Sequence, residues 1–169
     1  FLGSRPPYES LAGRADVLVF QTAPLDDDVE VTGAIEAELW IASNRPDTDF
    51  TIKLIDVYPP NEDYPHGYAM NLTDGILRCR YRDSWERPSL LTAGQVYRIT
   101  VSAFPTSNLF KRGHRIRLDV SSSNFPHFDL NSNTGAPEGG GRELRVATNR
   151  VFVDKQRASH VVLPVIRRT

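Results

Sequence analysis

Hydrophobic and polar residues alternate with a period of two along most of this 169-residue chain. Between Val29 and Ile41 the odd positions are mostly apolar and most even positions are polar, although Trp40 interrupts the polar side. This pattern is typical of a β-strand with one buried face. Equivalent patterns predict further strands at residues 16–22, 50–54, 76–82, 97–102, 115–121, 144–153 and 160–166.

The segment at residues 115–121 has the clearest register of these strands. Three apolar residues alternate there with Arg115, Arg117 and Asp119. A slip of one residue would turn all three charged side chains into the core, which is strongly disfavoured. We therefore expect a half-buried strand with a fixed register.

Clusters of Pro, Gly, Asn and Asp separate the strands and predict loops, for example at residues 43–47, 59–63 and 139–141. No stretch of ten or more residues carries the apolar stripe of a helix, although one helical turn fits residues 108–113. Eight or more short strands predict an all-β antiparallel sandwich. We expect a jelly roll and not an immunoglobulin arrangement, because the Cys-Trp-Cys pattern of immunoglobulin domains is missing. The kind of jelly roll that we expect is galactose-binding-domain-like.

The chain length suits one domain with a single core. Residues 1–15 contain Pro6 and Pro7 and show no alternation, so they predict an extended lead-in that needs another surface to lie on. Residues 16–169 form the predicted jelly-roll domain. Because the first residue is Phe1 and not Met, we expect a further part of the polypeptide to precede it.

Composition places the chain among ordinary globular proteins. Its 20 basic residues are matched by 21 acidic ones. A protein that binds nucleic acid is expected to have a surplus of basic residues, which this chain does not have. No apolar run is long enough to span a membrane, and the start lacks the features of a signal peptide. We expect no nucleic-acid or membrane partner and a cytoplasmic location, while homo-oligomer formation stays open.

The single cysteine, Cys79, excludes an intrachain disulfide and cannot build a zinc site alone. In a strand, Arg78 and Arg80 would point away from it, so no basic partner would activate the thiol. We predict a structural role for Cys79 as a small strand side chain.

The catalytic signature of an α/β serine hydrolase is missing. No Gly-x-Ser-x-Gly elbow occurs, and strands do not alternate with helices. The four histidines do not by themselves indicate a triad. His114 precedes a strongly patterned strand, and we expect it to make a structural hydrogen bond there. The sequence therefore predicts no catalytic residues.

No metal or cofactor site is predicted either. Asp26–Asp28 and Asp47–Asp49 have oxygen ligands suitable for calcium, but neither fits a spaced calcium loop, and we interpret both as solvated turn acids. Gly139–Gly141 lacks the Lys-Ser/Thr of a phosphate loop and predicts a flexible loop. A glycosylation sequon at residues 71–73 carries little weight without evidence of secretion.

Aromatic residues keep a second function open, that of a carbohydrate-binding or other ligand-binding module, because jelly rolls often serve this purpose. Packing in the core or at a domain interface explains them equally well. The candidates for a sugar-stacking surface are Trp40, Tyr58, Tyr64, Tyr68, Tyr81 and Trp85.

One stretch is distinctive enough to identify a family. Residues 113–126 read Gly-His-Arg-Ile-Arg-Leu-Asp-Val-Ser-Ser-Ser-Asn-Phe-Pro, and residues 131–135 read Asn-Ser-Asn-Thr-Gly. This resembles the C-terminal domain of X-Pro dipeptidyl-peptidase and cocaine-esterase-like hydrolases. Further segments agree in order, so that the resemblance runs from about Arg14 to Val165. They are residues 14–20, 28–33, 47–59, 74–78, 147–149 and 163–165.

The resemblance implies an upstream α/β-hydrolase domain with a Ser-Asp-His triad, a helical cap inserted in it, and this jelly roll packed against both. The implied reaction transfers an acyl group to water through an acyl-enzyme. Substrates in the family range from X-Pro peptides to small esters and acylated amines. The chain itself would be an inactive accessory domain that helps to shape the substrate cleft.

The motif residues favour loop architecture. Gly113 suits a positive φ angle, Arg115 can tie a neighbouring loop, and the Ser and Asn side chains can bond turn backbone. We expect the 121–135 region and the lead-in to face the catalytic domain, unless Phe125 and Phe128 are buried in the sandwich core. The family-motif and candidate interdomain residues are Gly113, His114, Arg115, Ser122, Asn124, Phe125, Pro126, Phe128, Asn131, Asn133, Thr134 and Gly135.

Overall fold

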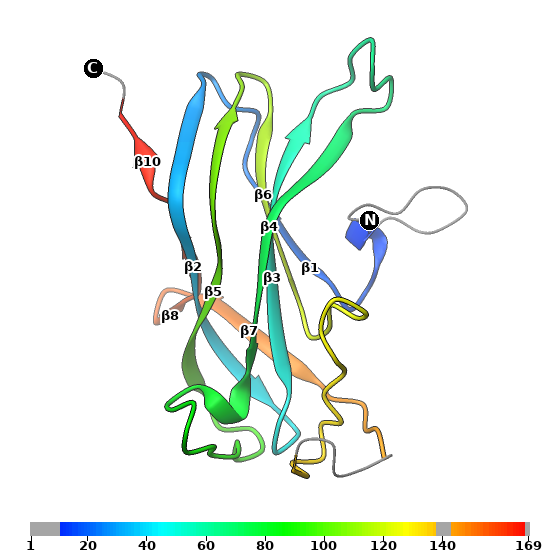
Figure 1. Ribbon diagram of the computed structural model, residues 1–169, viewed down its shortest axis with the longest axis vertical. Helices are drawn as coiled ribbons and strands as arrows, with labels where there is room; N and C mark the ends of the chain where they lie inside the picture. Colours follow the sequence, from blue (N-terminus) through cyan, green and yellow to red (C-terminus); the bar gives the residue numbers. More distant parts are fainter. Residues whose placement is uncertain (1–10, 138–142, 168–169) are drawn as a thin grey trace.

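The computed structural model describes residues 11–137 and 143–167, which form a two-layer antiparallel β-sandwich (Figure 1). The all-β sandwich that the alternation predicts is therefore confirmed. Two short 3-10 helices accompany the strands, η1 (Leu11–Gly13) and η2 (Cys79–Tyr81). No helix in the described ranges has the length and apolar character needed to cross a membrane.

The smaller sheet has the order β1-β6-β3-β4, and the larger sheet is built around β2. Strands of the smaller sheet are β1 (Leu18–Gln21), β6 (Arg115–Ser121), β3 (Asp49–Tyr58) and β4 (Tyr68–Arg78). Strands of the larger sheet are β2 (Val29–Ser43), β5 (Tyr97–Phe110), β7 (Asn149–Asp154), β8 (Arg157–Ala158), β9 (His160–Val162) and β10 (Val165–Ile166).

From β1 to β7 the chain passes to the other sheet at every connection except the β3–β4 hairpin. Repeated crossing between two antiparallel sheets is the connectivity of a jelly roll. The arrangement places the β1–β2, β5–β6 and β3–β4 connections at one end of the sandwich and the β2–β3 connection with η2 at the other (Figure 1).

The core lies between the sheets and is formed by the residues that the alternation predicts to point inward. Burial of each of the larger side chains, Val, Ile, Leu and Phe, contributes about 2 kcal/mol to the hydrophobic driving force. The buried apolar residues include Val31, Ile35, Ala37, Leu39 and Ile41 of β2, Phe50, Ile52 and Leu54 of β3, Ile99 and Val101 of β5, and Leu118 and Val120 of β6.

Two predicted boundaries in the middle of the chain are wrong. The strand expected at residues 76–82 ends at Arg78, and Cys79 begins η2. The helical turn expected at residues 108–113 is largely replaced by β5, which continues to Phe110 because that residue pairs with Val29 of β2. Long-range strand pairing overrides the local sequence signal in the second case.

The C-terminal strands are also shorter than predicted. The strand expected at residues 144–153 begins only at Asn149. The strand expected at residues 160–166 is interrupted at Pro164, which has no backbone N–H to donate. The carbonyl of Pro164 still accepts a hydrogen bond of 3.0 Å from the backbone N–H of Thr32.

The extended lead-in predicted for residues 1–15 is only partly described. Residues 11–13 form η1 and are therefore not extended, and the side chains of Arg14 and Asp16 form an exposed ion pair. Residues 1–10 and the Gly139–Gly141 loop lie outside the described residues.

The two sheets approach each other closely where β4 passes β5. A Cβ atom on Gly75 would lie 2.1 Å from the carbonyl oxygen of Ser102. Close by, the hydroxyl of Thr73 donates a hydrogen bond of 2.7 Å to the carbonyl of Phe104. Only glycine permits this contact between the backbones of the two strands.

Cys79 is fully buried, and burial raises the pKa of its thiol well above the ordinary range. Because the thiolate is the reactive form, we expect no reaction of the native chain with Ellman's reagent at about pH 8. One thiol per chain should react after denaturation. Rapid labelling of the native chain would contradict this placement of Cys79.

Candidate functional site

The outward face of the smaller sheet is charged and nevertheless buried. The half-buried strand predicted at residues 115–121 is β6, but Arg117 and Asp119 on its polar side are also buried. The Arg117 guanidinium donates two hydrogen bonds of 2.6 Å to the Asp119 carboxylate. Bidentate pairing of this kind allows two charges to leave water together.

A second buried network lies beside that pair. The ammonium of Lys53 on β3 donates a hydrogen bond of 2.6 Å to Asn124 Oδ1, and Asn124 Nδ2 donates one of 3.1 Å to Asp74 Oδ2. Burial lowers the pKa of Lys53, against the opposing effect of the carboxylates of Asp74 and Asp119. The motif residue Asn124 therefore ties its turn to the centre of the sheet.

Lys53, Asp74, Asp119 and Asn124 form the polar floor of a groove of about 1040 Å³. One wall is the segment 14–18, and the other consists of residues 121–127 and 146–149. Three exposed apolar side chains stand on the walls, Leu18, Phe125 and Val146, with Phe125 65% and Val146 83% exposed. The groove thus combines a polar floor with an apolar rim.

The two phenylalanines of the 121–135 region lie outside the sandwich core. Phe125 is exposed and lines the groove, and the peptide bond between Phe125 and Pro126 is cis. Phe128 is half-buried, and its ring meets the ring of His127 edge to face at 4.5 Å. Phe125 and Phe128 are thus not buried in the sandwich core, which was the arrangement that would have contradicted an outward-facing loop. That the loop faces a catalytic domain stays a prediction.

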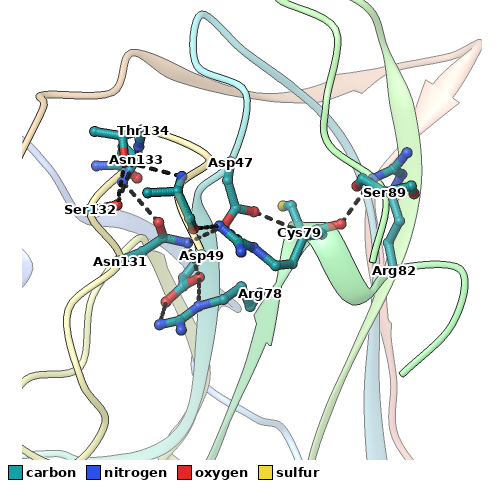
Figure 2. A network of polar contacts seen from close by, with 12 residues as sticks. Asp47, Asp49, Arg78, Cys79, Arg82, Ser89, Asn131, Ser132, Asn133 and Thr134 are labelled. Atoms are coloured by element: carbon teal, nitrogen blue, oxygen red, sulfur yellow. Dashed lines mark hydrogen bonds and ion pairs between the residues drawn. The ribbon is translucent and has the colours of Figure 1, made fainter. Parts of the chain in front are cut away.

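The loop at residues 131–135 is anchored by a buried polar network, drawn in Figure 2. Asn131 Nδ2 donates hydrogen bonds to Asp47 Oδ2 at 3.0 Å and to Asp49 Oδ1 at 2.6 Å. Asp47 also receives two hydrogen bonds from Arg80, at 3.0 Å from the backbone N–H and at 2.8 Å from Nε. Arg78 donates to both carboxylate oxygens of Asp49.

Asp47 and Asp49 are therefore not the solvated turn acids that the sequence predicts. Both carboxylates are buried, and Arg80 and Arg78 respectively compensate their charge. Burial raises the pKa of Asp49, although the hydrogen bonds from Arg78 and Asn131 oppose the shift.

Within the loop, polar side chains bond the neighbouring backbone, as the sequence predicts. The backbone N–H of Asn133 donates to Asn131 Oδ1 at 2.8 Å, and the hydroxyls of Ser132 and Thr134 lie 2.7 Å apart. Asn133 and Gly135 adopt positive φ angles of 58° and 76°. These contacts fix the loop in one conformation.

The Gly-His-Arg motif lies at the opposite end of β6. Gly113 has a φ of 83°, and Arg115 donates a hydrogen bond of 2.9 Å to the carbonyl of Thr22. His114 is buried, with Nδ1 2.8 Å from Asp56 Oδ1 and its ring 4.3 Å from that of Tyr58. This is the structural hydrogen bond expected at the start of the strand.

The twelve predicted site residues consequently do not form one surface. About 20 Å of strand separates the start of β6 from its end, at about 3.3 Å per residue. Ser122, Asn124, Phe125 and Pro126 lie in the turn at residues 121–127 that lines the groove, and Phe128 follows this turn in the sequence. The 131–135 loop is adjacent to this turn in sequence, but the Gly-His-Arg residues are remote from both.

Sequence reasoning missed the buried charges that fix these loops. Some of these charged residues lie within predicted strands, but a half-buried strand also predicts charges on its polar face. The missed residues are Lys53, Asp74 and Asp119 of the groove floor, Arg117 as the partner of Asp119, and Asp47, Asp49, Arg78 and Arg80 of the second network.

The aromatic residues proposed for sugar stacking are dispersed. The rings of Tyr64 and Tyr68 stack with their centroids 4.7 Å apart, and both lie beside Tyr58 near the β3–β4 connection. Trp85 stacks on Tyr81 of η2 at 5.6 Å. The two clusters occupy opposite ends of the sandwich (Figure 1), and thus offer no continuous platform.

Metal coordination and glycosylation find no support in the parts that are described. Residues 11–137 and 143–167 contain no group of three or more His, Cys, Asp or Glu side chains placed to hold a metal. The glycosylation sequon lies within β4, where the hydroxyl of Thr73 is bonded to backbone.

Comparison with known proteins identifies the domain. The profile of the X-Pro dipeptidyl-peptidase C-terminal non-catalytic domain matches residues 5–162. The chain belongs to this family. The sandwich of this family and the non-catalytic role implied by the sequence resemblance are thereby confirmed, and the ligand-binding alternative is not favoured.

Relatives of this family domain are hydrolases. Cocaine esterase from Rhodococcus sp. (strain MB1 Bresler) is 46% identical over 157 residues, which cover 92% of this chain and 26% of that protein. An α-amino acid ester hydrolase structure superposes with a TM-score of 0.85 at 33% identity and covers 98% of this chain. An aminopeptidase from a marine sediment Thaumarchaeota archaeon gives 0.84 at 32% identity over 92% of this chain.

A CocE/NonD family hydrolase from Staphylococcus aureus shares the fold, with a TM-score of 0.68 at 15% identity over 89% of this chain and 30% of that chain. The matched region covers 28% of the α-amino acid ester hydrolase and 27% of the aminopeptidase. This chain thus spans about a quarter of the length of these three relatives.

Proposed function

We propose that this chain is the C-terminal accessory domain of a serine hydrolase that cleaves ester or amide bonds. The family match over residues 5–162 carries the proposal, because the matching relatives are hydrolases about four times as long. In this proposal an α/β-hydrolase domain and a helical cap precede the sandwich in the same polypeptide. The sandwich packs on them and helps to shape the substrate cleft.

The geometry supports a role as a rigid platform. Polar networks fix the 121–128 turn and the 131–135 loop to the sheets, and exposed apolar side chains stand beside them. An interface between domains requires such a combination of fixed shape and apolar contact area.

Activity measurements on two proteins test this function. The first is the complete polypeptide encoded by the gene that contains this sequence, and the second is the 169-residue chain. We expect turnover of 4-nitrophenyl acetate by the complete polypeptide only. Turnover by the chain alone that disappears in His114→Ala would overturn the proposal, as would a complete polypeptide without esterase or amidase activity. X-Pro anilides, small esters and acylated amines would then define the substrate class.

Replacement of Phe125 tests whether the groove rim supports the hydrolase. Because Phe125 is exposed, Phe125→Asp should change the unfolding free energy of the 169-residue chain by no more than about 0.5 kcal/mol. In the complete polypeptide the buried carboxylate would weaken domain packing, and we expect loss of most hydrolase activity or a lower melting temperature.

Phe104→Asp is the matched control, because Phe104 on β5 is also 65% exposed and lies away from the groove. Activity and melting temperature should be retained in this control. Equal behaviour of the two variants would argue against the rim as part of the domain interface.

A further inference from the structure

The β3–β4 hairpin projects from one end of the sandwich and gathers oxidisable side chains there (Figure 1). Three of the six tyrosines of the chain lie on it, Tyr58, Tyr64 and Tyr68, together with the single methionine, Met70. Among the described residues, tyrosine rings contact one another only in this cluster. The hairpin is therefore the place where oxidation can join two tyrosines.

Tyr64 and Tyr68 are the closest pair of rings in the cluster. Their centroids are 4.7 Å apart and their planes differ by 18°. Tyr58 meets both rings edge to face, with centroid distances of 6.4 Å and 6.2 Å. Coupling of two tyrosyl radicals joins ring carbons next to the phenol oxygens, so the two rings must already lie against each other. The stacked pair meets this condition.

The backbone holds both stacked rings in place. The N–H of Tyr64 donates to Asn61 Oδ1 at 2.8 Å, and its carbonyl accepts from the N–H groups of Asn61 and Gly67 at 3.0 Å and 2.8 Å. Gly67 has a φ of 75°, and a Cβ atom there would lie 2.7 Å from the carbonyl oxygen of Tyr58. Tyr68 is fixed in β4, where it pairs with Tyr58. This order raises the effective concentration of one ring beside the other.

The two stacked phenols can release their protons to water, because Tyr64 and Tyr68 are 42% and 43% exposed. Tyr58 differs in this respect. Its hydroxyl donates to the sulfur of Met70 at 3.6 Å, and burial, with a smaller effect from the charge of Asp56, raises the pKa of its phenol. Oxidation of a tyrosine at neutral pH proceeds with loss of the phenol proton, so radicals are favoured at the stacked pair.

We propose that Tyr64 and Tyr68 are a site of oxidative modification and form an intramolecular dityrosine. Each phenol loses one proton to water and one electron to a one-electron oxidant, of the kind that a peroxidase generates from peroxide. The two radicals join through a bond between ring carbons next to the phenol oxygens, and the hydrogens of these carbons move to the oxygens. The product has two hydrogen atoms fewer, and the oxidant has gained two electrons.

Photo-oxidation of the complete polypeptide with tris(bipyridine)ruthenium(II) and persulfate tests the proposal, because this mixture generates a one-electron oxidant in the light. Trypsin leaves all three tyrosines of the hairpin in one peptide, residues 54–78. Mass spectrometry measures the fraction of this peptide that has lost two hydrogen atoms, and fragmentation locates the bond.

We expect a modified peptide that gives no backbone fragments from between residues 64 and 68, because the new bond closes this part of the chain into a ring. Tyr64→Phe and Tyr68→Phe should each abolish the product. Tyr97→Phe is the matched control and should retain it, since the Tyr97 ring contacts the guanidinium of Arg82 and no other tyrosine among the described residues.

Two further samples show whether the native stack directs the coupling. Gly67→Ala displaces the loop that carries Tyr64 and should lower the yield several-fold, and so should unfolding in urea. Equal yield in the urea-unfolded protein would overturn the proposal, because the short separation in the sequence would then explain the bond. A bond to Tyr58, bonds only between two copies, or an unmodified peptide in the native protein would overturn it as well.

Discussion

Gly75→Ala is expected to destabilise the sandwich by about 3 kcal/mol or more, which for a domain of this size removes a large part of its stability. The new Cβ would lie 2.1 Å from the carbonyl oxygen and 2.7 Å from the carbonyl carbon of Ser102, and 2.8 Å from Cα of Ala103. All three atoms belong to the backbone of β5, so no side-chain rotation can relieve the clash. The two sheets would have to separate at this edge.

Urea unfolding of the 169-residue chain, followed by tryptophan fluorescence, measures the effect. Gly13→Ala is the control, because apart from its chain neighbours no atom of the described residues lies within 4 Å of a Cβ at that position, and its φ is not in the left-handed range. The control should stay within about 0.5 kcal/mol of the original chain. A Gly75→Ala variant as stable as this control would show that β4 and β5 do not approach as described.

Asp47→Ala is expected to cost about 3–5 kcal/mol, because it leaves the guanidinium of Arg80 buried without its counter-charge. The same change removes the hydrogen bonds to the backbone N–H of Arg80 and to Asn131. The 131–135 loop would lose one of its two attachments to the β3 region, since Asp49 is then the remaining acceptor for Asn131.

The double variant Asp47→Leu with Arg80→Met separates the burial of charge from the loss of packing. Apolar residues of similar volume need no counter-charge, so this variant should recover part of the lost stability. Asp26→Ala, at an exposed turn, serves as the control. If Asp47→Ala unfolds at the same urea concentration as this control, the buried ion pair does not support the fold.

The alternation of residues was sufficient to predict the sandwich and the inward face of its main strands. Val31, Ile35 and Leu39 are buried as the odd positions of β2 require, and the register at residues 115–121 is the predicted one. Periodicity reports which side chains share a face, because the pleat fixes that relation locally. Periodicity therefore predicts burial correctly wherever the core between the sheets is the only structure that buries a side chain.

Periodicity could not predict that Lys53 and Asp119 are buried on the opposite face. Two segments lie beside this face. Residues 14–18 are distant from β3 in the sequence, and residues 121–127 continue from the end of β6. Cover by such segments depends on tertiary packing, and no property of the strand itself reveals it.

The prediction of solvated turn acids at Asp47–Asp49 was wrong for a related reason. Acidic residues next to Pro46 have the composition of an exposed turn. Their partners Arg78, Arg80 and Asn131 lie 29 to 84 residues away in the chain, so turn statistics cannot include them. Asn131 was selected only through its family motif, and the structure supplies the physical reason for its place in that motif.

Fluorophosphonate labelling of the complete polypeptide is the most direct test of the relation between this domain and hydrolysis. The reagent modifies an activated serine, and peptide mapping locates the modified residue. The account predicts a single labelled serine upstream of Phe1, with residues 1–169 unmodified. A labelled serine within residues 1–169, or no labelled serine in the whole polypeptide, would contradict it.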